Sequence, residues 1–136
     1  DLYGTPTLLA HGDAWCTDDA RYQTFRAQVR EPAWQADFLA KPLAERHALA
    51  AALRERSEQA KADKRPEIMD VNADAVAEAF RQHAVKRIIH GHTHRPALHA
   101  LVVDGRPCER WVLPDWYDDH GGYLVCDSQG CHAEAW

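Results

Sequence analysis

The stretch KRIIHGHTHRP, residues 86–96, runs from an apolar segment directly into a group of histidines. Lys86 to His90 is predicted to be a buried strand, because β-branched isoleucines dominate it. Gly91 lets the backbone bend where the strand ends. Residues two apart in an extended segment point to the same side, so His92 and His94 are predicted to converge on one metal cluster.

A second short strand is predicted at Thr5 to Ala10, and it delivers His11-Gly12-Asp13 at its end. Helices are expected between this strand and Lys86 to His90, which makes the two strands parallel partners. Folds of this α/β class place their chemistry at the carboxyl ends of strands. His11 is therefore a second candidate for the same site.

The remaining elements are predicted from caps, prolines and turn residues. Pro32 and Pro66 are expected to end helices, and Asn72 to cap one. The expected helices are Ala20–Arg30, Trp34–Leu39, Leu43 to about Asp63, and Ala73–His83. An antiparallel meander is expected afterwards, built from Leu98–Val103, Cys108–Leu113, Gly122–Cys126 and Cys131–Trp136, with Asp104-Gly105 as one hairpin turn.

Composition excludes several classes of protein. The chain has 136 residues, a hydrophobic fraction of 46% and a net charge of -5, which fits one globular domain and argues against a nucleic-acid binder. It has neither a long apolar run nor a secretory signal, so we expect a soluble cytosolic protein. The four cysteines are too scattered for a disulfide scaffold and are expected to be reduced, mostly buried thiols; they are Cys16, Cys108, Cys126 and Cys131.

The long predicted helix has a cationic face. Arg54, Ser57, Lys61 and Lys64 follow at spacings of three, four and three, so they share one side of the helix. Residues 41–65 carry seven Lys and Arg against four Asp and Glu. Such a face either binds a phosphate group or is simply a solvated surface.

Most other histidines are expected to be surface or hydrogen-bonded residues, and the pattern leaves the role of His90 open. Those expected on the surface or in hydrogen bonds are His47, His83, His99, His120 and His132.

Together, the histidine motifs resemble those of calcineurin-like metallophosphoesterases. Within that superfamily, three stretches resemble the pyrophosphatases that act on UDP-2,3-diacylglucosamine in lipid A biosynthesis: residues 11–19, 68–72 and 89–96. The resemblance covers nearly the whole chain. It implies the C-terminal half of a calcineurin-like β-sandwich flanked by helices, with residues 1–14 and 71–136 in the core and residues 15–70 forming an inserted helical cap. Where these pyrophosphatases usually have Leu-Gly-Asp-Trp, this chain has Leu113-Pro114-Asp115-Trp116.

The resemblance also implies the site residues. His11 and His92 would bind one of two manganese ions and His94 the other, with His92 also catalytic and in contact with substrate. The implied substrate contacts are Asp19, Ser57, Lys61, Lys64 and His92. The other metal ligands of these enzymes come from segments without a counterpart here, so the chain alone is expected to be inactive without the missing N-terminal half.

The implied reaction is metal-dependent hydrolysis of the pyrophosphate of UDP-2,3-diacylglucosamine to UMP and 2,3-diacylglucosamine 1-phosphate. The implied location is the cytoplasm, with peripheral contact at the inner membrane. Apolar cap residues would line an acyl-chain groove or form a small core of the cap; they are Trp34, Phe38, Leu39, Leu49 and Leu53. Two alternatives remain at this stage: another calcineurin-like phosphodiesterase or nuclease, or a non-catalytic interaction module stabilised by structural zinc.

Overall fold

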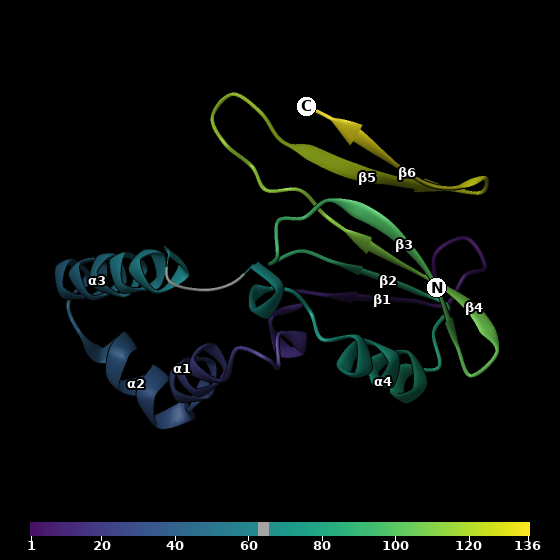
Figure 1. Ribbon diagram of the computed structural model, residues 1–136. Coiled ribbons are helices and arrows are strands. Elements are labelled where there is room, and N and C mark those ends of the chain that lie inside the picture. Colours follow the sequence, from purple (N-terminus) through teal and green to yellow (C-terminus); the bar gives the residue numbers. More distant parts are fainter. Residues whose placement is uncertain (63–65) are drawn as a thin grey trace. The chain divides into compact units, whose positions relative to one another are not determined.

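The computed structural model describes residues 1–62 and 66–136, and the side chains of residues 61–67 lie outside this description. The chain divides into two compact units, one formed by Asp1–Cys16 with Val71–Trp136 and the other by Thr17–Asp70 (Figure 1). The first unit combines strands with one α-helix, and the second is helical. The class of the fold is therefore a mixed α/β fold, as the sequence predicts.

The first unit is built on a four-stranded mixed sheet with the order β1-β2-β4-β3. Its strands are β1 (Thr7–Ala10), β2 (Arg87–His90), β3 (Ala97–Val103) and β4 (Arg106–Val112). Strand β2 lies parallel to both β1 and β4, and β3 pairs with β4 as an antiparallel hairpin. All four residues of β2 are buried, as expected for a central parallel strand. The predicted parallel pairing of the two histidine-bearing strands is confirmed.

Helix α4 (Ala73–His83) covers one face of this sheet (Figure 1). Its apolar stripe contributes Val76, Ala79 and Phe80, which pack against Ile88 of β2. Successive residues of a strand face opposite sides, so Ile88 and His90 face α4 while Ile89 faces the other side. His90, the last residue of β2, therefore lies on the α4 side of the sheet.

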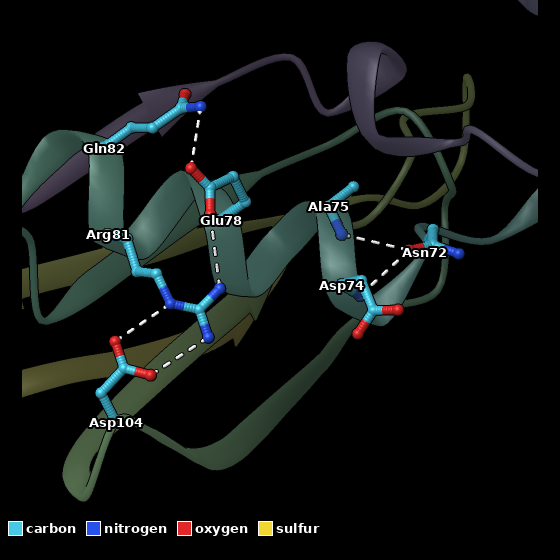
Figure 2. Close-up of polar contacts among 7 residues, drawn as sticks. All are labelled: Asn72, Asp74, Ala75, Glu78, Arg81, Gln82 and Asp104. Carbon is cyan, nitrogen blue, oxygen red and sulfur yellow. Dashed lines mark hydrogen bonds and ion pairs between the residues drawn. The ribbon is translucent and has the colours of Figure 1, made fainter.

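Two polar contacts fix the ends of α4 (Figure 2). At its start, the Asn72 side chain accepts hydrogen bonds from the backbone N–H groups of Asp74 and Ala75, at 2.9 and 3.1 Å. Near its other end, Arg81 donates two hydrogen bonds, of 3.0 and 3.1 Å, to Asp104 in the turn between β3 and β4. The helix is thereby joined to the sheet through charged groups as well as through its apolar face.

The C-terminal strands differ from the single meander that the sequence predicts. Strands β5 (Gly122–Asp127) and β6 (Gly130–Ala135) form a separate two-stranded sheet. The prediction was wrong because β4 already pairs on both of its sides, with β2 and β3, and leaves β5 no free edge there. The hairpin lies instead on the side of the four-stranded sheet away from α4, where its residues Leu124 and Cys126 share a cavity with Leu9 and Ile89 (Figure 1).

The hairpin also corrects the expectation of four reduced cysteines. Cys126 and Cys131 are directly opposite each other across β5 and β6, with their Cα atoms 4.1 Å apart, and they form a disulfide. The turn from Asp127 to Gly130 creates this register, and the expectation of reduced thiols failed because it relied on the scattered spacing of the four cysteines rather than on the pairing of these two strands. Cys16 and Cys108 are buried thiols outside this disulfide, as predicted.

The second unit contains α1 (Ala20–Arg30), α2 (Pro32–Ala40), α3 (Leu43–Ala62) and the short 3-10 helix η2 (Pro66–Met69). Pro32 opens α2, which therefore begins two residues earlier than predicted, because proline suits the first turn of a helix. Neither α1 nor α2 has a fully buried residue, and Leu39, Leu43 and Leu49 are exposed. Among the helices of the described ranges, none is both long enough and apolar enough to cross a bilayer.

Replacing Asn72 with alanine is expected to lower the free energy of unfolding of the first unit by about 1 kcal/mol, because two backbone N–H groups at the start of α4 lose their acceptor. Urea unfolding followed by circular dichroism measures this loss. Asn72→Asp keeps an acceptor at the same position and is the matched control. Equal destabilisation by both substitutions would contradict the capping role.

The Arg81–Asp104 contact is expected to give a pH-dependent contribution to stability. Hydrogen bonds from Arg81, together with its charge, hold the pKa of Asp104 below its ordinary value of 3.8. Because the native pKa is lowered, the contribution is fully present above about pH 4 and is lost as the pH falls through the native pKa. Urea unfolding of wild type and Asp104→Asn between pH 7 and pH 2 should show a difference that disappears at the acidic end.

The exposed Asp118 provides the control for this series, since Asp118→Asn makes the same chemical change in the loop before β5. We expect its unfolding curve to follow that of wild type across the whole pH range. A difference between wild type and Asp104→Asn that does not change with pH would contradict the assigned role of the charge.

Candidate functional site

The carboxyl ends of β1 and β2 bring two histidines together. The Nε2 atom of His11 and the Nδ1 atom of His92 are 3.1 Å apart, and the ring centroids are 4.8 Å apart. The two residues lie in separate loops, which are joined by a hydrogen bond from the Gly91 N–H to the His11 carbonyl oxygen, at 3.2 Å. His11 is exposed and His92 is partly exposed, so the pair is accessible to solvent.

The loop after β2 is not the extended segment on which the sequence argument relied. His92 and His94 have φ angles of +68° and +51°, which lie in the left-handed region. Residues in that conformation do not follow the alternation of a strand, so the argument that their rings point the same way does not apply. His92 instead contacts His11, a residue far away in sequence. Such backbone conformations are costly outside glycine and are concentrated at functional sites.

His94 has a different partner, Asp115 in the segment after β4. Its Nδ1 atom is 3.3 Å from the Asp115 carboxylate. A hydrogen bond with the Tyr117 side chain lowers the pKa of the Asp115 carboxyl, and a backbone hydrogen bond and the nearby His94 lower it further. A carboxylate at this distance favours the tautomer of His94 that carries its proton on Nδ1, which leaves the lone pair on Nε2.

His90 is fully buried beneath the loops. Arg110 Nη1 lies 2.9 Å from its Nε2 atom, and the Gly91 carbonyl oxygen lies 2.9 Å from its Nδ1 atom. The ring also contacts the Trp15 ring edge to face, with centroids 5.5 Å apart. Both ring nitrogens are therefore engaged with protein groups, which is the usual state of a buried hydrogen-bonded histidine.

The donor set fits part of one metal site. Two imidazole nitrogens bound to one divalent ion, each at about 2.0–2.1 Å, lie roughly 3 Å from each other, and His11 and His92 have this spacing. Within residues 1–62 and 66–136, no group of three or more His, Cys, Asp or Glu side chains is arranged to hold a metal. The pair therefore offers two ligands, and His94 is not grouped with them.

A cavity of about 570 Å³ adjoins these histidines within the first unit. His92 and His94 form part of its wall, and the rest is mostly apolar, including Leu9, Leu113 and Trp116. A mostly apolar cavity with a few polar groups is the usual setting for a ligand.

Apart from His92, the predicted substrate contacts fall within residues 17–70. Asp19 is buried and caps α1, accepting a hydrogen bond of 3.0 Å from the Tyr22 N–H. This cap is the structural role that an acidic residue at a helix start favours, and contact with substrate stays a prediction. Ser57 is exposed on α3. The Lys61 side chain and Lys64 lie outside the described residues.

Sequence reasoning assigned no site role to Asp115 and Arg110. Asp115 follows the end of β4 by three residues, and a carboxylate just after a strand is a signal that could have been used. Arg110 gives no local signal, because it meets His90 only through the pairing of β4 with β2.

Paired imidazole nitrogens at the ends of adjacent parallel strands define a candidate metal centre of the kind that metal-dependent hydrolases use. Comparisons with known proteins agree with this class. The chain is 58% identical over 130 residues to the UDP-2,3-diacylglucosamine hydrolase of Aromatoleum aromaticum, a match that covers 96% of the chain. It is 57% identical to the enzyme of that name from Bordetella pertussis and 54% identical to that of Cellvibrio japonicus, over 90% and 92% of the chain.

The chain belongs to the UDP-2,3-diacylglucosamine hydrolase family. It spans about half the length of the curated relatives that it matches, between 50% and 53% for these three. No family model matches the chain. The resemblance inferred from the histidine motifs is confirmed.

Titration of Mn²⁺ into the chain is expected to broaden the ring proton NMR signals of His11 and His92 together. Removing either ring by His11→Ala or His92→Ala should weaken binding at the other by at least about tenfold, since even partners outside the ligand set contribute that much. His83→Ala, an exposed position at the end of α4, is the control. Unchanged broadening of His92 in His11→Ala would contradict a shared ion.

Proposed function

We propose that the chain supplies the C-terminal portion of a calcineurin-like β-sandwich enzyme that hydrolyses the pyrophosphate of UDP-2,3-diacylglucosamine. The products are UMP and 2,3-diacylglucosamine 1-phosphate, in lipid A biosynthesis. The observation that carries the proposal is the 3.1 Å separation of His11 Nε2 and His92 Nδ1, in a chain whose relatives bear the name of this hydrolase. Other phosphodiesterase, nuclease and zinc-module functions are not favoured by these relatives.

In this proposal His11 and His92 bind one divalent ion and His94 binds a second, both of them Mn²⁺ or a similar cation. Bound ions of this kind neutralise phosphate charge and make water nucleophilic near pH 7. His92 also faces the substrate, and its ring donates to a phosphate oxygen as charge develops there. Asp115, whose carboxylate lies 3.3 Å from His94 Nδ1, would favour the tautomer of His94 that leaves Nε2 available to bind the second ion.

We assign the helical unit the role of a cap over the lipid-bearing part of the substrate. Ser57 and Lys61 of α3, together with Lys64, would contact phosphate, and Asp19 would contribute at the start of α1. The exposed Leu39, Leu43 and Leu49 would meet acyl chains. Cationic and apolar side chains on the same helices also suit peripheral contact with the cytoplasmic face of the inner membrane.

A fused protein tests the proposal. The part of the Aromatoleum aromaticum hydrolase that this chain does not match is joined to residues 1–136, and hydrolysis of UDP-2,3-diacylglucosamine is measured with Mn²⁺. We expect turnover by the fusion and negligible turnover by the 136-residue chain, because its described residues group only two ligands. In ¹⁸O-labelled water the label should enter UMP, as attack at the α-phosphorus requires.

His92→Ala in the fusion should lower turnover by about a hundredfold or more, and His83→Ala should not. A folded fusion without turnover, or label found in the lipid phosphate, would sink the proposed reaction. Cleavage of simple phosphodiesters in place of the UDP-sugar would favour the alternative phosphodiesterase.

A further inference from the structure

The buried ring of His90 contacts both of the loops that carry His11 and His92. It is fully buried at the end of β2, on the face of the sheet that carries α4. Its main-chain carbonyl accepts a hydrogen bond of 2.7 Å from the Leu113 N–H, so its backbone is held by β4 as well as by β1. The backbone from which the His90 ring extends therefore has a fixed position in the sheet.

The hydrogen-bond partners of His90 fix the orientation of its ring. A guanidinium has only donors, so Arg110 donates to Nε2 and that nitrogen is the acceptor. The proton of the neutral ring is then on Nδ1, which donates to the Gly91 carbonyl oxygen. One edge of the ring is thus attached to β4, and the other is attached to the loop that leads to His92.

The loop after β1 packs directly on the same ring. Gly12 has a φ angle of +100°, and a Cβ atom added there would lie only 2.6 Å from His90 Nδ1 and 3.2 Å from the Gly91 carbonyl oxygen. The ring cannot retreat, because it is buried and touches Trp15 on another side. Gly12, which adjoins His11, therefore packs against the Nδ1 edge of the His90 ring, and Gly91, which adjoins His92, accepts a hydrogen bond at the same edge.

We propose that His90 is a positioning residue that holds the His11 and His92 loops together against one edge of its ring and thereby sets the separation of their metal-facing nitrogens. The inference rests on the proposed metal site and adds to it a residue that binds neither metal nor substrate. The arrangement also requires Gly12, because only a residue without a side chain lets the His11 loop lie against the His90 ring.

The test uses Mn²⁺ titrations of the 136-residue chain, with broadening of the His11 and His92 ring signals as the measure of affinity and their mutual nuclear Overhauser effect as the measure of spacing. Gly12→Ala and His90→Ala should each lower the apparent affinity by roughly tenfold or more and weaken the Overhauser effect. The double variant should be no worse than either single variant, because the added methyl group then occupies space that the ring has left.

Two further variants separate positioning from general loss of structure. Gly105→Ala places alanine at another glycine of positive φ, +76°, with nothing within 4 Å of the added Cβ, and should bind Mn²⁺ like wild type. His90→Asn keeps a side-chain N–H for the Gly91 carbonyl and should recover much of the affinity that His90→Ala loses. Circular dichroism of every variant reports whether the fold is kept.

The outcomes distinguish this inference from the proposed function. Wild-type chain that shows no paired broadening would overturn the metal site and the inference with it. Paired broadening in wild type together with unchanged affinity in folded Gly12→Ala or His90→Ala would overturn the inference alone. If Gly12→Ala does not fold, the test is the comparison of His90→Asn with His90→Ala. An equal loss of Mn²⁺ affinity in these two variants would contradict the positioning role of His90.

Discussion

The site depends on the parallel pairing of β1 with β2. Its register places Ala10 opposite His90, so the residues that follow each strand, His11 and Gly91, leave the sheet side by side. Parallel strands need a long crossover connection, and here the helical unit and α4 lie between them in sequence. A shift of this register by one residue would send every side chain of β1 to the opposite face. The 3.1 Å contact between His11 and His92 is therefore a consequence of sheet pairing rather than of either loop alone.

Much of the fold could be predicted because its signals are local. Asn72 caps α4 as expected, since an asparagine before an apolar helical pattern has few other roles. The hairpin of β3 and β4 turns at Asp104 and Gly105, both with positive φ, which is the preference that the Asp-Gly pair expresses. The buried β2 was evident from consecutive isoleucines. In each case the residues that determine a helix cap, a turn or a strand lie within a few positions of it in the sequence.

The remainder could not be predicted because it depends on pairings across the chain. The partners of His90 require the pairing of β4 with β2. The left-handed conformations of His92 and His94 are uncommon for residues other than glycine, so a prediction that assumes an extended segment fails there. A site assembled from the ends of several strands is therefore harder to predict from the sequence than the strands themselves.

Pro114 stands where the related pyrophosphatases usually have glycine, and the structure shows which residues this proline contacts. From the sequence, proline at this position only removes a backbone donor near the expected site. In the structure its ring lies close to Gly122 at the start of β5, where an added Cβ would be 2.9 Å from the ring. Proline fixes its own φ angle, so this contact and the Leu113 hydrogen bond to His90 restrict the chain immediately before Asp115. The carboxylate that contacts His94 therefore follows a segment with little conformational freedom, whereas His94 itself lies in an exposed loop.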